Sequence, residues 1–202
     1  MPRGIRPTQD KVRKAVFDIL GDIEGLTFLE LFAGSGAVGF EALSRGAAEL
    51  TLVELNRDAI LAIKRNMEFL KVANCKLFHL EAEKAVKLLS LDKKRFDIIF
   101  IDPPYFKPPR LSKLEGSAEA AFTVSNVEPL APRLGSGLTL DKVGGLGKKI
   151  LQTLEAYDIL SPHGLVIVQH SKLEPLPKDA LIFSLIKEAK YGDTWLSIFR
   201  KK

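Results

Sequence analysis

The 202-residue sequence predicts a doubly wound α/β fold, in which helices cover both faces of a mostly parallel sheet. Short β-prone runs alternate with amphipathic helical segments along the first hundred residues. A nearly continuous apolar run at Phe96–Ile101, interrupted only by Asp97, is typical of a parallel strand that is covered on both faces. Two β-rich runs near the end of the chain predict a closing antiparallel hairpin.

The first helix is expected to run from about Thr8 to Leu20. Pro7 favours a helix start, and Thr8 is expected to be the N-cap, whose side chain accepts a hydrogen bond from a free N–H group of the first turn. Apolar residues such as Val12 and Val16 recur on one side, while lysine and arginine occupy the other. This pattern indicates an amphipathic helix that buries one face.

Strands and helices then alternate through the rest of the fold. Gly46 is expected to end the second helix, and Asn56 marks the start of the third. The expected order is a strand at 27–32, the helix ended by Gly46, a strand at 50–53, the helix from Asn56, a strand near 76–80, a helix around 85–89, a strand at 96–101, a helix at 150–157 and a strand at 165–169. Residues 180–185 and 194–199 supply the closing hairpin.

Residues 107–147 interrupt this alternation. They hold four prolines and six glycines and show no sustained period, so we expect a long insertion just after the fourth strand. Its place beside the ligand-binding edge of the sheet predicts a mobile lid or a segment that contacts the substrate, with a short helix at 111–122 and glycine hinges at its returning end. A tolerated surface insertion without function is the alternative.

Composition sets the broad class of protein. With 46% hydrophobic and 27% charged residues, the chain fits a single globular domain over residues 1–202. Cys75 is the only cysteine, which excludes an intramolecular disulfide and fits a reducing compartment. No apolar run approaches the roughly 18 residues of a membrane span, and the start of the chain lacks the apolar segment of a secretory signal. We therefore expect a cytoplasmic monomer without a membrane partner.

A glycine-rich turn follows the first predicted strand. Gly34, Gly36 and Gly39 lie where glycines permit a tight turn and let backbone N–H groups approach a ligand at a helix N-terminus. Glu54 ends the second strand, where a carboxylate can accept hydrogen bonds from ribose hydroxyls. The pattern predicts a nucleoside-containing cofactor and leaves open whether it is NAD or S-adenosylmethionine. A tight turn followed by a surface glutamate is the alternative.

A second motif, Asp102-Pro103-Pro104-Tyr105, ends the fourth strand at the sheet edge where doubly wound folds bind ligands. An exocyclic amine of a nucleic-acid base is a poor nucleophile, because its lone pair is delocalised into the ring. The carboxylate of Asp102 and the carbonyl of Pro103 could accept its two N–H groups, on a backbone that the prolines stiffen. Tyr105 offers a ring on which an unstacked base can lie.

This motif predicts methylation of an amino group on a base, and it does not identify the base. The alternative is a proline-rich strand end with a capping aspartate and a core tyrosine. His79, His163 and His170 show no metal or nucleophile pattern, and each is expected to be a partly exposed polar residue near a strand end. No metal is expected, because a sulfonium methyl donor is intrinsically reactive and the enzyme supplies orientation and dipoles.

Residues 30–36 resemble the first motif of Rossmann-like class I methyltransferases, in which an acidic residue inside strand one precedes an aromatic-x-Gly-x-Gly turn. The resemblance implies that Glu30 helps to hold the methionine ammonium of S-adenosylmethionine. It also implies that Phe32, with Gly34 and Gly36, forms the cofactor turn.

The same resemblance assigns the remaining cofactor contacts. It implies that Glu54 holds the ribose and that Glu81, just after the third strand, lies against the adenine amine. A solvated glutamate at a helix start is the alternative for Glu81.

Further segments, at 6–13, 41–47 and 191–194, resemble one family, the bacterial 16S ribosomal RNA guanine-N2 methyltransferases. The resemblance covers residues 6–202 except the insertion. It implies that the segment from Arg6 to Thr8 closes over the methionine end of the cofactor. It also implies that the substrate is guanine in small-subunit ribosomal RNA, either free or in an assembly particle.

The net charge of +5 suits such a polyanionic partner. Arg3, Lys107, Arg110 and Lys113 are expected to bind RNA phosphates, with a solvated charged face as the alternative.

Three other functions stay open from the sequence. An adenine amino-methyltransferase acting on DNA or RNA would use the same Asp102 motif. An NAD-dependent oxidoreductase would explain the glycine turn and Glu54 but would leave Asp102 to Tyr105 without a task. A catalytically silent RNA-binding assembly factor would keep the fold without turnover.

Overall fold

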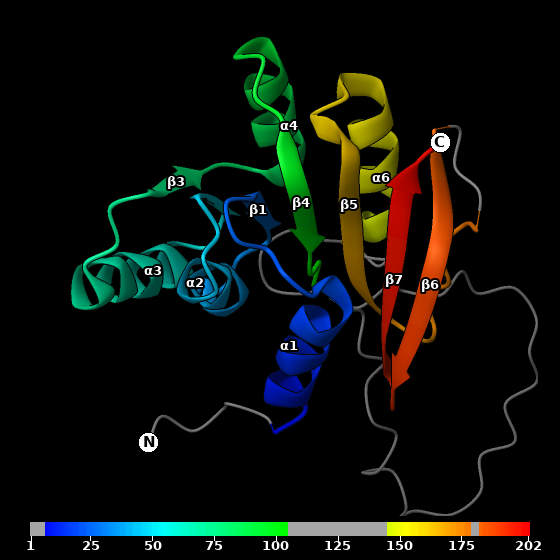
Figure 1. Ribbon diagram of the computed structural model, residues 1–202, viewed down its shortest axis with the longest axis horizontal. Helices are drawn as coiled ribbons and strands as arrows, with labels where there is room; N and C mark the ends of the chain where they lie inside the picture. Colours follow the sequence, from blue (N-terminus) through cyan, green and yellow to red (C-terminus); the bar gives the residue numbers. More distant parts are fainter. Residues whose placement is uncertain (1–6, 105–144, 179–181) are drawn as a thin grey trace, which may run out of the picture.

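The computed structural model describes residues 7–104, 145–178 and 182–202, with a seven-stranded sheet at its centre (Figure 1). The strands lie in the order β3-β2-β1-β4-β5-β7-β6. They are β1 (Thr27–Leu31), β2 (Glu49–Glu54), β3 (Cys75–His79), β4 (Phe96–Ile101), β5 (Leu160–Ser171), β6 (Phe183–Tyr191) and β7 (Thr194–Lys201). The first five are parallel, and β7 pairs antiparallel with both β5 and β6. The predicted fold class and the closing hairpin are confirmed.

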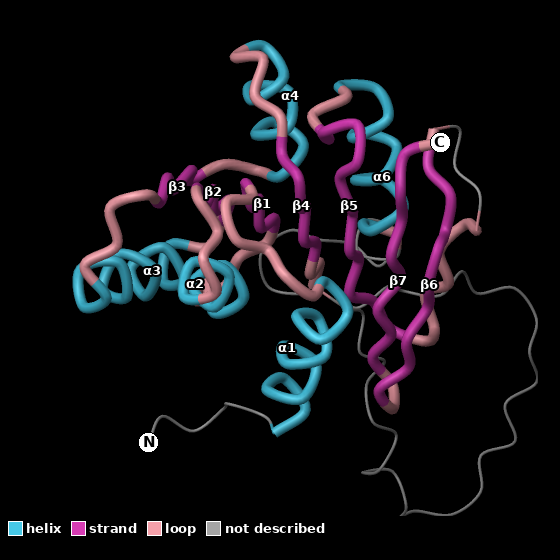
Figure 2. The backbone as a smooth tube through the Cα atoms, in the orientation of Figure 1, coloured by secondary structure: helices cyan, strands magenta, loops and turns pink. Residues whose placement is uncertain are grey.

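Helices cover both faces of this sheet (Figure 2). Within the described ranges they are α1 (Pro7–Leu20), α2 (Ala37–Ser44), α3 (Arg57–Leu70), α4 (Ala82–Leu91) and α6 (Leu146–Tyr157). Buried residues of α4 and α6 share one hydrophobic cluster with the sheet, and those of α1, α2 and α3 share another. The sheet is therefore the middle of three layers.

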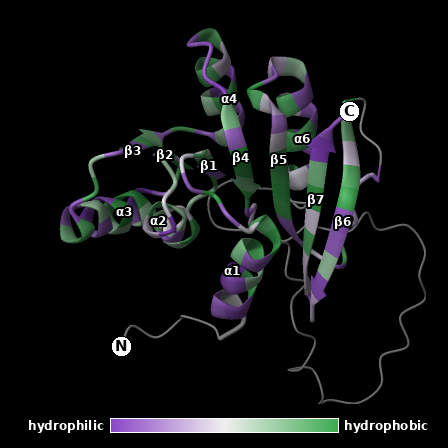
Figure 3. Cartoon of the chain, in the orientation of Figure 1, coloured by the Kyte–Doolittle hydropathy of each residue, from purple (hydrophilic) through white to green (hydrophobic). Residues whose placement is uncertain are grey.

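Burial follows the hydrophobic pattern of the strands. In β4, every residue but Asp97 is buried, as expected for a strand with neighbours on both sides and helices on both faces. Figure 3 shows the hydrophobic colour along β4 and β5, whereas α1 carries polar colour on its outer side. Asp97 accepts hydrogen bonds from the N–H and the hydroxyl of Thr27, so its carboxylate ties the start of β4 to the start of β1.

Local signals fix several helix ends as predicted. The Asn56 side chain accepts hydrogen bonds from the N–H groups of Asp58 and Ala59, which makes it the N-cap of α3. Gly46 follows α2 with φ +93°, a left-handed conformation that glycine adopts without steric cost.

Two predicted boundaries are wrong. Thr8 is not the N-cap of α1, because Pro7 is already helical; proline suits the first helical position, where its fixed φ fits and no N–H is needed. Gly147 does not belong to the insertion, because α6 begins at Leu146 after Gly145, whose φ is +90°.

The later strands are longer than the hydrophobic pattern predicts. Strand β5 starts at Leu160 rather than at Leu165. The residues between them are mostly polar and the register with β4 shifts after Phe96, so the hydrophobic pattern does not indicate a strand there. Strand β6 starts later than predicted, at Phe183, and continues to Tyr191 through residues that are half-buried or exposed.

His170 corrects another expectation, because it is buried rather than partly exposed. Its Nε2 lies 2.8 Å from the hydroxyl oxygen of Ser197, and its Nδ1 lies 3.1 Å from the carbonyl oxygen of Ser171. These partners compensate for the loss of water. Burial lowers the pKa of the ring. His79 and His163 are exposed, as predicted.

Most of the predicted insertion, including its helix at 111–122, lies outside the described residues. Among the helices that the structure describes, none combines the length and the apolar character needed to cross a membrane.

Candidate functional site

Backbone hydrogen bonds join the carboxyl ends of neighbouring strands. The N–H of Ala33 donates to the carbonyl of Val53 at 3.0 Å, and the N–H of Asp102 donates to the carbonyl of Leu31 at 3.3 Å. The residues that follow β1, β2 and β4 therefore share one edge of the sheet. This edge brings together the glycine turn, Glu54 and Asp102.

The turn after β1 is built from left-handed residues. Phe32, Gly34 and Gly36 have φ values of +60°, +55° and +74°. Phe32 is half-buried and packs on the cluster under α4 and α6, so its packing offsets a conformation that is unfavourable for a side chain. A Cβ on Gly36 would lie 2.8 Å from the Phe40 ring, so only glycine fits there.

Glu54 ties this turn to the end of β2. One carboxylate oxygen, Oε2, accepts the N–H of Gly34 at 2.7 Å. The other, Oε1, accepts the N–H groups of Leu55 and Asn56, each at 2.7 Å. A carboxylate has about four acceptor positions. Three are used within the protein, which leaves about one for a ligand.

Glu30, in the middle of this edge, is 3% exposed. Its Oε2 accepts the N–H of Gly39 at 2.8 Å. Burial raises the pKa of Glu30 to about 8, although the Gly39 hydrogen bond opposes the rise and the charges of Asp102 and Glu54 add to it. The carboxyl group is therefore mostly protonated near neutral pH.

The end of β4 is held from the side of α6. Pro103 is buried, Asp102 is half-buried and Pro104 is exposed. A Cβ on Gly147 in the first turn of α6 would lie 4.0 Å from Pro103 and 3.3 Å from Val168, so helix, strand β5 and proline meet there. This packing limits the movement of the backbone next to Asp102.

Glu81 occupies the N-cap position of α4 but makes no capping hydrogen bond. Its exposed side chain forms an ion pair with Lys84 at 3.1 Å. The position is that of an exposed glutamate at a helix start, and its predicted contact with the adenine stays a prediction.

Several predicted site residues lie outside the described part of the chain. Arg6 and Tyr105 are among them, as are the four predicted phosphate-binding residues, Arg3, Lys107, Arg110 and Lys113. The backbone of Thr8 lies in the first turn of α1.

Sequence reasoning missed two contacts that shape the turn. The side-chain amide of Asn66 on α3 donates to the carbonyl of Ser35 at 3.0 Å, which anchors the turn from outside the motif. The hydrogen bond from Gly39 to Glu30 was also missed. The period of two along β1 carried a usable signal for it, since Glu30 shares a face of the strand with Phe28 rather than with Leu29 and Leu31.

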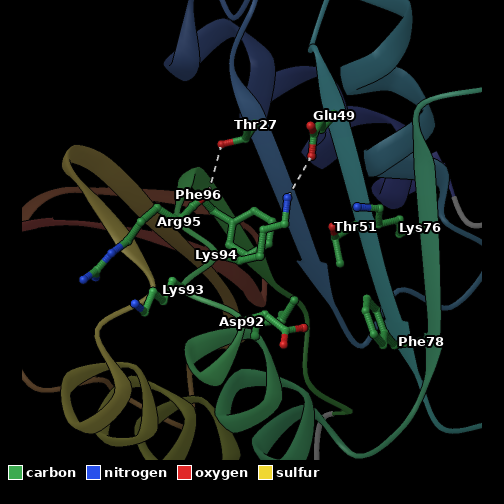
Figure 4. A pocket seen from close by; sticks show the side chains of 11 residues that line it. Thr27, Glu49, Thr51, Lys76, Phe78, Asp92, Lys93, Lys94, Arg95 and Phe96 are labelled. Carbon is green, nitrogen blue, oxygen red and sulfur yellow. Dashed lines mark hydrogen bonds and ion pairs between the residues drawn. The ribbon is translucent and has the colours of Figure 1, made fainter.

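A separate hollow of about 270 Å³ lies at the opposite edge of the sheet, between the starts of β1, β2 and β4 and the end of α4 (Figure 4). Lys94 crosses it to Glu49 at 3.7 Å, and Phe78 and Phe96 form apolar walls. The glycine turn does not line it. Among the described residues, no group of three or more acidic, histidine or cysteine side chains is placed to hold a metal ion.

The strand order, the glycine turn and the acidic end of β2 define a class I methyltransferase fold. The chain belongs to the family described as "Conserved hypothetical protein 95", whose model matches residues 1–116.

Named relatives agree with this class. "Putative rRNA methyltransferase YlbH" of Bacillus subtilis is 27% identical over 199 residues, which cover 98% of this chain and 88% of that protein. "Ribosomal RNA small subunit methyltransferase D" of Escherichia coli is 39% identical over 103 residues, which span 50% of each protein. The solved structure of "Putative methyltransferase yhhF" from Escherichia coli superposes with a TM-score of 0.69 at 26% identity, over all of this chain and 91% of that one. The predicted resemblance to the 16S ribosomal RNA methyltransferase family is confirmed, and the guanine-N2 specificity stays a prediction.

Proposed function

We propose that the protein transfers a methyl group from S-adenosylmethionine to the exocyclic 2-amino group of a guanine in small-subunit ribosomal RNA. The observation that carries this proposal is the placement of Asp102 directly beside the glycine turn, through the hydrogen bond from Asp102 N–H to the Leu31 carbonyl. The names of the relatives from Escherichia coli and Bacillus subtilis support an RNA methyltransferase rather than an NAD-dependent enzyme.

The cofactor turn fits a nucleoside ligand. Gly34 leaves room for close approach, because nothing lies within 4 Å of the position that its Cβ would take. The first N–H groups of α2 lie at the same edge of the sheet. Since three acceptor positions of Glu54 are taken by backbone N–H groups, we expect Glu54 to accept one ribose hydroxyl rather than two. When bound, S-adenosylmethionine supplies an electrophilic methyl group. By resemblance, Phe32 also lines this site, Glu81 lies near the adenine, and Arg6 and Thr8 close it.

The reaction site belongs to the residues after β4. The carboxylate of Asp102 accepts one N–H of the guanine amine, and the carbonyl of Pro103 accepts the other. Both acceptors would turn the nitrogen lone pair out of conjugation and toward the methyl group. As the nitrogen–methyl bond forms and the sulfur–methyl bond breaks, S-adenosylhomocysteine would leave, and the amine would release one proton to Asp102 and on to solvent. Pro103 is held against α6 and β5, so its carbonyl keeps a fixed direction. Tyr105 lies outside the described residues, and its predicted role is to offer a ring on which the base stacks.

The decisive experiment is tritiated methyl transfer from S-adenosylmethionine to total RNA and to small-subunit particles, followed by nucleoside analysis. The proposal expects N2-methylguanosine from ribosomal RNA. A product of N6-methyladenosine would contradict the guanine assignment and keep the methyltransferase. No transfer to either substrate, together with retained RNA binding, would favour a silent assembly factor.

The RNA partner has a separate test. If phosphates are bound by lysine and arginine, the affinity for RNA should fall steeply as salt rises. An affinity that stays flat from 50 to about 200 mM salt would contradict an RNA substrate. Sedimentation of the free protein would check the proposed monomer.

A further inference from the structure

The side chain of Glu30 points in a direction that the glycine-turn motif alone does not predict. Within the described ranges, it is the only acidic side chain that is buried. Leu29 and Leu31 belong to the cluster under α4 and α6, so Glu30, like Phe28, faces the layer of α1, α2 and α3. The side chain therefore points at the start of α2.

The N–H groups at the start of α2 need a hydrogen-bond acceptor from outside the helix. Its N-cap residue is Gly36, which has no side chain and makes no capping hydrogen bond. The first turn of a helix leaves N–H groups without partners inside the helix. Glu30 accepts the N–H of Gly39 at 2.8 Å, and the backbone N–H of Val38 opposes the rise of the Glu30 pKa less strongly than that of Gly39 does. A residue on β1 thus does what a serine or aspartate does at an ordinary N-cap.

The third glycine of the turn fits this arrangement. A Cβ on Gly39 would lie 2.8 Å from Oε2 of Glu30, 2.6 Å from Leu50 and 2.8 Å from Leu52. The carboxyl group and the two leucines occupy the space in which any other residue would place its side chain. Glu30 and Gly39 therefore form one structural unit.

We infer that Glu30 is a positioning residue, which caps α2 and so holds the cofactor turn, and that it does not bind the methionine ammonium of the cofactor. This inference rests on the proposed function, because it concerns the same cofactor. It replaces the role that the family resemblance implies for Glu30.

The electrostatics agree with the geometry. The ionisable groups whose charges act on Glu30 are Asp102 and Glu54, and Cys75 lies near enough for Glu30 to influence its thiol. Both carboxylates disfavour a further negative charge at Glu30, as does burial, which raises the pKa of Glu30 to about 8. A protonated carboxyl group can still accept an N–H at its carbonyl oxygen, whereas only the ionised form would attract an ammonium group.

The test compares S-adenosylhomocysteine with its analogue that lacks the amino group, by calorimetry, in the wild type and in Glu30→Gln. Glutamine has the same shape and keeps an oxygen that can accept the Gly39 N–H. The loss of affinity caused by removing the ammonium should be the same in both proteins, within about twofold. A charge-assisted contact would make this loss at least about tenfold smaller in the variant. That result would overturn the inference.

Two further arms keep the outcomes distinct. If the wild type binds neither ligand, the proposed function fails and Glu30 is not at issue. Glu49→Gln, at the opposite edge of the sheet, is the matched control and should leave both affinities unchanged.

The wild type alone provides a second measurement. The affinity ratio of the two ligands should stay constant between pH 6 and about 8.5, a range that spans the titration of Glu30. A ratio that rises about tenfold or more with pH would mean that ionised Glu30 binds the ammonium.

Discussion

Gly39→Ala tests the packing of the cofactor turn, because two physical effects predict opposite signs. Helix propensity alone would make alanine more stable than glycine in α2 by about 1 kcal/mol. The structure predicts the reverse, since the new Cβ would lie 2.6 Å from Leu50 and 2.8 Å from both Leu52 and the Glu30 carboxyl group. Overpacking of this kind costs about 1–3 kcal/mol, and disturbing the buried hydrogen bond adds about 1–3 kcal/mol.

The net expectation is a loss of about 3 kcal/mol in the free energy of unfolding. For a chain of this length, each kcal/mol lowers Tm by about 2–4 °C, so Gly39→Ala should melt about 6–12 °C below the wild type. Differential scanning calorimetry measures this directly. Cofactor affinity should fall as well, because Glu30 and the first turn of α2 must shift together.

Gly147→Ala is the matched control, because Gly147 also lies in the first turn of a helix. Its Cβ would meet Leu176 and Val168 at 3.3 Å, a contact that small movements can relieve. We expect a change within about 1 kcal/mol, since the propensity gain offsets the mild crowding. If Gly39→Ala melted at or above the wild-type temperature while Gly147→Ala did the same, the packing argument for the turn would be wrong.

Three further predictions follow from the site and the core. Asp102→Ala should reduce methyl transfer by about 10²-fold or more while the affinity for S-adenosylhomocysteine changes little, measured by tritium transfer and calorimetry; normal turnover would contradict the proposed reaction site. Burial raises the pKa of Glu30 from 4.5 to about 8, so the folded state keeps the proton over a range in which the unfolded state loses it. The free energy of unfolding should therefore decrease as pH rises from about 4.5 to about 8, by at most about 5 kcal/mol. This pH dependence should be absent in Glu30→Gln. Burial lowers the pKa of His170 below 6.5, so the unfolded state binds the proton more readily and stability should fall as pH drops below about 6.5; a His170→Gln variant with an unchanged acid slope would argue against this.

The alternation of strands and helices was readable from the sequence because it depends on local patterns. Strands β2, β4 and β5 each contain an apolar run, and Asn56 and Gly46 mark helix ends by chemistry that acts over three or four residues. The glycine turn and Glu54 were readable for the same reason, since their spacing reflects one strand, one turn and one helix.

The contacts that could not be read depend on how separate strands and helices pack against each other. His170 meets Ser197 across the β5–β7 pairing, so its burial depends on a strand that follows 24 residues later. Glu30 is predicted as a ligand because the motif shows that it is acidic. The period of two along β1 indicates the side on which it lies, whereas its hydrogen-bond partner depends on how α2 packs on β1. Residue type was informative at both positions, and the partner atoms needed the tertiary structure.

Strand β7 follows β6 in the chain but lies between β5 and β6 in the sheet. During synthesis, the edge of β5 must therefore wait without a partner until Thr194–Lys201 has left the ribosome. A nascent chain that stops before this segment exposes a long, apolar strand edge, which invites pairing with other chains. Folding of the sheet thus depends on translation of the β7 segment, and truncations before Thr194 should be recovered as aggregates rather than as a smaller folded unit.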